Sequence, residues 1–119
     1  MADAPEVPAE DVAKLRGIIT QYFSSRALYA VAVLDVAEAL TGGANGIDEL
    51  AAAVGAHAPS LYRVLRVLAA SGIFREEEGR RFSNTPLSEL LRADVPGSLR
   101  DLVLLFGDET SWRSWELRW

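Results

Sequence analysis

One continuous segment, residues 47–85, restricts the fold of this chain more than any other feature. Apolar residues recur at helical spacing over residues 47–54 and, after a glycine, over residues 58–71. Two short arms, residues 73–75 and 81–83, then flank a charged tip in the pattern of a β-hairpin. A short helix, a turn, a longer helix and a hairpin in this order predict a winged helix-turn-helix.

Two helices are predicted before this segment. Apolar residues follow spacings of three and four over residues 9–24, and residues 26–40 form a second helical stretch. The second stretch is apolar on nearly all sides, so a helix there has to be buried on more than one side. Because a domain of 119 residues has little interior for this, the surplus apolar surface indicates contact with a second chain.

Three further helices are predicted after the hairpin. The first is brief, over residues 86–91, with Thr85 as its N-cap, and the second covers residues 98–106. The last begins at Thr110 and carries three tryptophans at spacings of three and four up to Trp119. A complete protein rarely ends in a helix on an exposed tryptophan, so we expect this sequence to be part of a longer protein.

These elements define the expected fold class and domain. It is mainly α: a winged helix-turn-helix with additional N-terminal dimerisation helices, C-terminal helices and one small β-hairpin wing. The domain covers residues 10–119. Residues 1–9 are rich in acidic residues and proline and lack the basic start and apolar run of a signal peptide, so we expect a disordered lead-in there.

Composition narrows the possible functions. The chain has a formal charge of −5 and no cysteine, which excludes disulfides and thiolate metal sites and fits a cytoplasmic protein. Its one histidine, His57, falls in a predicted surface loop and cannot build a multi-histidine metal site. No apolar run approaches the roughly 20 residues of a membrane span. The sequence offers no catalytic, cofactor-binding or metal-binding residue that we can assign.

Four segments, taken in order, resemble the N-terminal domain of S-adenosylmethionine-dependent small-molecule O-methyltransferases, both the bacterial antibiotic-tailoring and the plant phenolic types. They are ALYAVAVLDVAEAL (27–40), IDELAAAVGAHAPSLYRVLRVLAASGIF (47–74), RRFSNTPLSELLR (80–92) and SWRSWELRW (111–119). The resemblance covers about residues 10–119. In these enzymes the domain dimerises by interlocking its first helices with those of its partner.

The resemblance also implies what this chain lacks. In the family a Rossmann-like domain follows, binds the methyl donor and carries the catalytic histidine. That domain is absent from this sequence, and His57 does not match its histidine. S-adenosylmethionine is therefore expected for the full enzyme and not for this chain, and the missing domain would act in cis or in trans.

Two groups of residues carry over from the family. The first helices would form a homodimer interface, and the apolar stripes found above support this independently. The predicted interface residues are Val12, Leu15, Ile18, Ile19, Tyr22, Phe23, Leu28, Val31 and Leu34. Phe106, Trp112 and Trp115 fall in the part of the domain that lines the acceptor pocket, and an aromatic wall suits a flat aromatic or polyketide-like acceptor. Packing within the chain's own core is the alternative for each residue.

We therefore predict the dimerisation and acceptor-shaping domain of an O-methyltransferase of secondary metabolism. One alternative is a DNA-binding regulator that presents Ser60, Arg63, Arg66 and Val67 to the major groove. The acidic run Glu76–Glu78 on the wing and the lack of a basic surplus disfavour nucleic acid as a partner. The other alternative is a stand-alone dimeric module that binds a small molecule or a protein.

Overall fold

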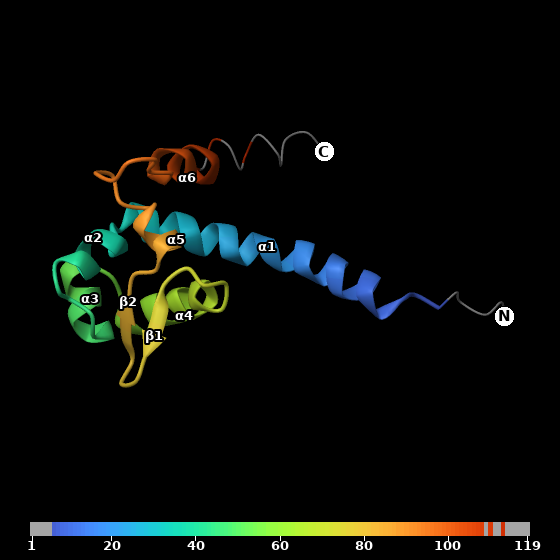
Figure 1. Ribbon diagram of the computed structural model, residues 1–119, viewed down its shortest axis with the longest axis horizontal. Coiled ribbons are helices and arrows are strands. Elements are labelled where there is room, and N and C mark those ends of the chain that lie inside the picture. The colour runs from blue at the N-terminus through green and yellow to red at the C-terminus, as the bar shows by residue number, and fades with distance from the viewer. Residues whose placement is uncertain (1–5, 109, 111–112, 114–119) are drawn as a thin grey trace.

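A single long helix, α1 (Ala9–Val33), forms the N-terminal part of the computed structural model, which describes residues 6–108, 110 and 113 (Figure 1). The two predicted N-terminal helices are thus one helix as far as Val33, because serine at positions 24 and 25 is a modest helix former and not a breaker. The break lies at Asp35, which adopts a left-handed conformation with φ of 56°, as aspartate does more readily than most residues. A short helix, α2 (Val36–Thr41), follows.

The helix-turn-helix and the wing lie where the sequence predicts them. Helix α3 (Ile47–Val54) ends at Gly55, whose φ of 72° favours glycine. Helix α4 (Ala58–Ala69) begins with a proline in its first turn. Strands β1 (Arg75–Glu77) and β2 (Arg81–Ser83) then pair antiparallel as the predicted hairpin.

Two short helices follow the wing. Helix α5 (Pro86–Glu89) has the predicted cap: the Ser88 backbone N–H donates to Thr85 Oγ1 at 3.3 Å, and the Thr85 N–H donates to Ser88 Oγ at 2.8 Å. Helix α6 (Arg100–Gly107) lies beside α1 (Figure 1). The tryptophan-rich helix predicted from Thr110 falls almost wholly outside the described residues.

The core lies between the second half of α1, helices α2 to α4 and the wing. Each helix contributes its apolar stripe, and each side of the wing contributes one phenylalanine. The large hydrophobic side chains that are fully buried are Val31, Val36, Leu50, Leu65, Leu68, Phe74 and Phe82.

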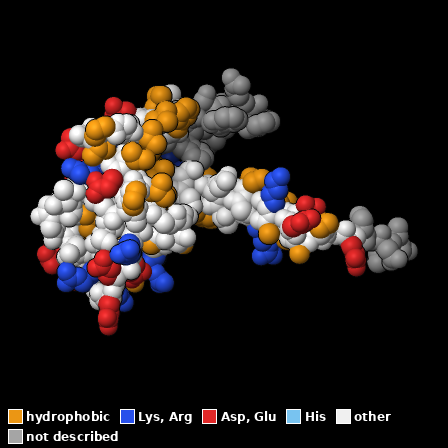
Figure 2. Space-filling model, in the orientation of Figure 1, with side chains coloured by type: hydrophobic (Ala, Val, Ile, Leu, Met, Phe, Trp, Pro, Cys, Tyr) orange, Lys and Arg blue, Asp and Glu red, His pale blue; other side chains and the backbone are white. Residues whose placement is uncertain are grey.

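The first half of α1 projects away from this core. We call residues 9–23 the arm; every residue in it is exposed. Figure 2 shows hydrophobic side chains along the arm, beyond the body of the molecule, and the molecule is 61 Å long but only 28 Å across its shortest axis. Within the described part of the chain, no helix combines the length and the apolar character needed to cross a membrane. The arm is therefore an apolar helix whose large side chains are largely exposed in the described structure.

Candidate dimerisation surface and the hollow between α1 and α6

The arm carries six large apolar side chains on one side of the helix. Their spacing of three, four or one residue keeps them within less than half of the helix circumference. Their exposed fractions range from 41% to 60%. They are Val12, Leu15, Ile18, Ile19, Tyr22 and Phe23. The Tyr22 and Phe23 rings meet edge to face, with centroids 5.6 Å apart, so the apolar stripe ends in an aromatic pair next to the body.

The other three predicted interface residues lie elsewhere. Val31 is 1% exposed and belongs to the chain's own core. Leu28 and Leu34 are half-buried and pack against that core. Within the second half of α1, Ala27 and Val31 belong to the core, and Ser25 and Leu28 line a hollow with residues of α6. Val31 has no surface left for a second chain, whereas Leu28 and Leu34 stay predicted interface residues beside those of the arm.

Hydrogen bonds hold helix α6 to the second half of α1 at one end and to the turn between α1 and α2 at the other. At one end, Arg26 Nη1 donates to the Gly107 carbonyl oxygen at 2.7 Å. At the other, Arg100 Nε donates to Asp35 Oδ1 at 2.9 Å. Gly107 also approaches the Tyr29 ring closely: a Cβ at position 107 would lie 2.4 Å from Tyr29 Cδ2. This junction fixes where the apolar face of α6 lies relative to α1.

A hollow of about 290 Å³ opens between the two helices. Ser25 and Leu28 of α1 and Leu102, Val103 and Phe106 of α6 line it, together with Gly107. Figure 2 shows hydrophobic side chains gathered over α6. The predicted acceptor residue Phe106 thus lies on the rim of a largely apolar hollow, with 67% of its surface exposed. The predicted Trp112 and Trp115 lie outside the described residues. Ser25 and Leu102 were not among the predicted residues, because only the packing of α6 on α1 brings them together.

One face of α4 is joined to the wing by hydrogen bonds. The Tyr62 hydroxyl donates to Glu76 Oε2 at 2.7 Å, and Arg66 Nε lies 3.5 Å from Glu76 Oε1. The hydrogen bond to Glu76 raises the pKa of Tyr62, and burial and the negative charge of Glu76 raise it further. The sequence predicts Glu76 to Glu78 as a solvated wing tip; Glu76 instead turns toward α4 because side chains alternate along β1.

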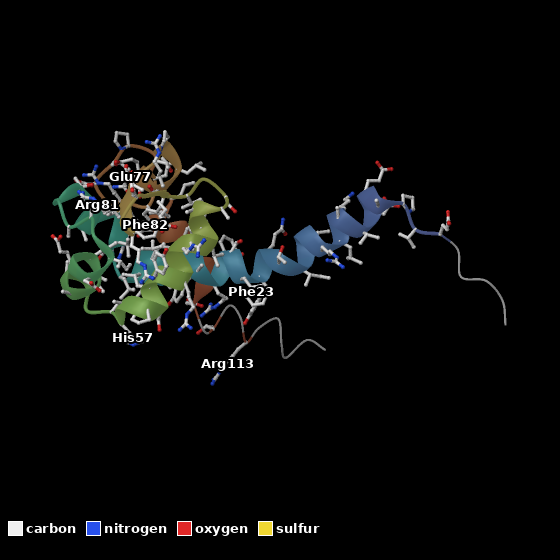
Figure 3. All side chains as sticks on the ribbon, turned by 90° about the horizontal axis from the view of Figure 1, so that it is seen from below. Phe23, His57, Glu77, Arg81, Phe82 and Arg113 are labelled. Atoms are coloured by element: carbon white, nitrogen blue, oxygen red, sulfur yellow. The ribbon has the colours of Figure 1, made fainter. Side chains whose placement is uncertain are left out.

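His57 lies apart from both the arm and the hollow. Figure 3 places it at the turn before α4, far from Phe23. Its Nδ1 lies 2.8 Å from Ser60 Oγ, and both residues are exposed, as the sequence predicts for a surface loop. Across residues 6–108, 110 and 113, no group of three or more histidines and carboxylates is placed to hold a metal ion.

Comparison with known proteins identifies the family to which this chain belongs. The profile of the O-methyltransferase dimerisation domain matches residues 17–94. The chain is 40% identical over 112 residues to the phenazine O-methyltransferase PhzM of Lysobacter antibioticus, a match that covers 94% of this chain and 32% of that protein. It is 40% identical over 92 residues to the phenazine-1-carboxylate N-methyltransferase of Pseudomonas aeruginosa, covering 77% of this chain and 27% of that one.

A solved structure agrees. The methyltransferase CalO1 of calicheamicin biosynthesis, in its SAH-bound form, superposes with a TM-score of 0.76 and 36% identity, over 91% of this chain and 32% of that one. The chain therefore spans about a third of the length of the proteins it matches.

Proposed function

Because this chain belongs to the O-methyltransferase dimerisation domain family, we propose that it is the dimerisation and acceptor-positioning part of an S-adenosylmethionine-dependent methyltransferase. The acceptor is an aromatic or polyketide-like small molecule. The donor-binding and catalytic groups lie outside this sequence, in the same polypeptide or in a second one. The observation that carries the proposal is the uncovered apolar arm, since a dimerisation domain needs such a surface and a monomer does not.

The arm has the physical properties of one half of a symmetric interface. A 15-residue helix is marginally stable in water without tertiary contacts, and every residue of the arm is exposed in the described structure. Each large apolar side chain that becomes buried contributes about 1.5–3 kcal/mol. In a twofold dimer every such contact occurs twice, so six side chains per arm can offset the cost of association.

The hollow between α1 and α6 supports the second part of the proposal. Its lining of leucine, valine and phenylalanine suits a flat apolar ring. Its volume of about 290 Å³ is at the lower limit of small-molecule pockets, so we infer that it forms one wall and that the donor-binding part completes it. Methyl transfer is an in-line displacement in which the acceptor bonds to the methyl carbon as the sulfonium bond breaks. The role of this chain in that step is to orient the acceptor and exclude water.

The dimer is tested by sedimentation equilibrium of the 119-residue chain. We expect twice the chain mass of 12.9 kDa. Ile19→Lys, which places a charge at the centre of the arm, should shift the mass to that of a single chain. Val67→Lys is the matched control, because Val67 is an exposed apolar residue on α4 outside the arm. A single-chain mass for the unaltered protein, or equal effects of the two lysines, contradicts the arm as the interface.

The methyltransferase assignment is tested on protein isolated from its native cells. A chromosomal affinity tag recovers the natural polypeptide with its partners, whose intact mass is then measured. The recovered material should transfer labelled methyl groups from S-adenosylmethionine to fused-ring aromatic phenols. Aromatic amines belong in the same panel, because one of the relatives is an N-methyltransferase. Recovery of dimeric protein that neither binds the donor nor transfers methyl groups contradicts this assignment and favours a stand-alone binding module.

A further inference from the structure

A second hollow lies at the start of α4, on the side of the molecule formed by α3, α4 and the wing. It has a volume of about 280 Å³. Tyr62 forms part of its wall, and the first turns of α3 and α4 close two of its sides. Arg63 of α4 and Arg80 of the wing turn, both exposed residues, line it from two different elements. It contains no residue of the arm and shares no lining residue with the hollow between α1 and α6.

The backbone holds Arg80 in an unusual conformation that directs its side chain here. Its φ is 55°, which costs a non-glycine residue about 1–3 kcal/mol. The Arg80 carbonyl oxygen accepts a hydrogen bond from the Ile47 N–H at 3.0 Å, which ties the wing turn to the start of α3. The Arg80 guanidinium carbon then lies 4.9 Å from the centroid of the Tyr62 ring. The guanidinium is therefore oriented in advance, without a carboxylate.

The charged residues that line the hollow carry a net positive charge, which favours binding of an anion. Within the described part of the chain, neither Arg63 nor Arg80 forms an ion pair, whereas Arg66, on the same face of α4, pairs with Glu76. Asp48 also lines the hollow and offsets one of the two positive charges. The start of α4 adds a partial positive charge, because no side chain caps its first N–H groups.

We propose that this hollow binds a phosphate monoester of a small molecule. Two arginines from different elements, next to a helix N-terminus without a side-chain cap, can donate hydrogen bonds to the oxygens of a phosphate. The volume of about 280 Å³ accommodates a phosphate with its organic group partly seated in the hollow. A phosphate monoester carries up to two negative charges at neutral pH, and the two arginines keep one net positive charge after Asp48 has offset the other.

Isothermal titration of the full chain with adenosine monophosphate tests the proposal, with inorganic phosphate and benzoate as comparison probes. Saturable binding of the monophosphate at millimolar or lower concentration is expected, with weaker binding of benzoate. Arg63→Gln and Arg80→Asn should each weaken binding about tenfold or more, the effect of losing one charge-assisted hydrogen bond. Asparagine is chosen at position 80 because it tolerates positive φ. Asp48→Asn should strengthen binding, since it removes the opposing charge.

Arg81→Gln is the matched control. Arg81 is an exposed wing arginine without an ion pair among the described residues, and it does not line the hollow. Circular dichroism of each variant shows whether the fold is kept. Absence of saturable binding to the unaltered chain overturns the proposal, and so does an equal loss in Arg81→Gln. Preferential binding of a DNA duplex with steep salt dependence also overturns it, because the α4 face would then read nucleic acid.

Discussion

The arm and the winged body contain similar apolar residues at similar helical spacing, and their environments are opposite. Phe82 of the wing is 1% exposed inside the body, while Phe23 of the arm is 60% exposed where α1 leaves it (Figure 3). The body folds around its own apolar residues, whereas the arm leaves its apolar residues largely exposed in the described structure. Apolar periodicity thus shows that a face is to be buried but not which chain buries it.

The two phenylalanines give the largest expected contrast. Phe82→Ala removes a fully buried ring and should lower the free energy of unfolding by about 3–5 kcal/mol at any protein concentration. Phe23→Ala should leave the stability of the dilute monomer nearly unchanged and should weaken the dimer. Urea denaturation of both variants over a hundredfold range of protein concentration separates the loss of monomer stability from the weakening of the dimer. Equal, concentration-independent losses would show that the arm folds back onto its own chain.

Alanine substitutions at two glycines, one in the body and one in the arm, should have effects of intermediate size on stability. Gly107→Ala places a methyl group against the Tyr29 ring, so it should displace α6 from α1 at a cost of about 1–3 kcal/mol. Gly17→Ala lies in the arm with no atom within 4 Å of its added methyl group, and should stabilise the helix by about 0.5–1 kcal/mol. Thermal denaturation at low protein concentration compares the two. If Gly17→Ala weakens self-association, the partner arm passes closely at that residue.

Removal of the helix cap at Thr85, in the body, should have a smaller effect on the free energy of unfolding. Thr85→Ala removes the acceptor for the Ser88 N–H and the hydroxyl that donates to the Gly72 carbonyl oxygen at 2.8 Å. We expect a loss of about 1 kcal/mol in the free energy of unfolding. The arm offers no comparable substitution, since the N-cap residue of α1, Pro8, makes no side-chain hydrogen bond to the helix. Thr85→Ser, which keeps the hydroxyl, should retain most of the stability in the same urea titration.

The smallest expected effect is on the pKa of the Tyr62 phenol, which a pH titration measures. Its pKa is raised above 10.0, chiefly by the hydrogen bond to Glu76. Because the protonated phenol is favoured in the folded state, this contribution to stability is complete below pH 10 and is lost as pH rises through the raised pKa. Absorbance titration near 295 nm, with Tyr62→Phe subtracted, isolates this phenol. Glu76→Gln should lower the pKa of Tyr62 toward 10; an unchanged pKa would contradict the assigned cause.

Local signals explain why much of the fold was predictable. Gly55 ends α3, Pro59 lies in the first turn of α4 and Thr85 caps α5 because each acts through its own backbone or that of its immediate neighbours. The helix break was misplaced for the opposite reason. Asp35 takes a left-handed conformation where α2 turns against α3 and the core, and no local residue pattern marked that position.

By itself, the sequence determined the winged helix-turn-helix, the position of its wing and the presence of surplus apolar surface, because these depend on periodicity and on single turn and cap residues. Only the tertiary structure decided which surface stays uncovered. It buried Val31 and exposed Ile19 on the same helix, brought Phe106 to Leu28, and turned Glu76 toward Tyr62. Those outcomes depend on contacts between residues far apart in the chain, which helical spacing cannot specify.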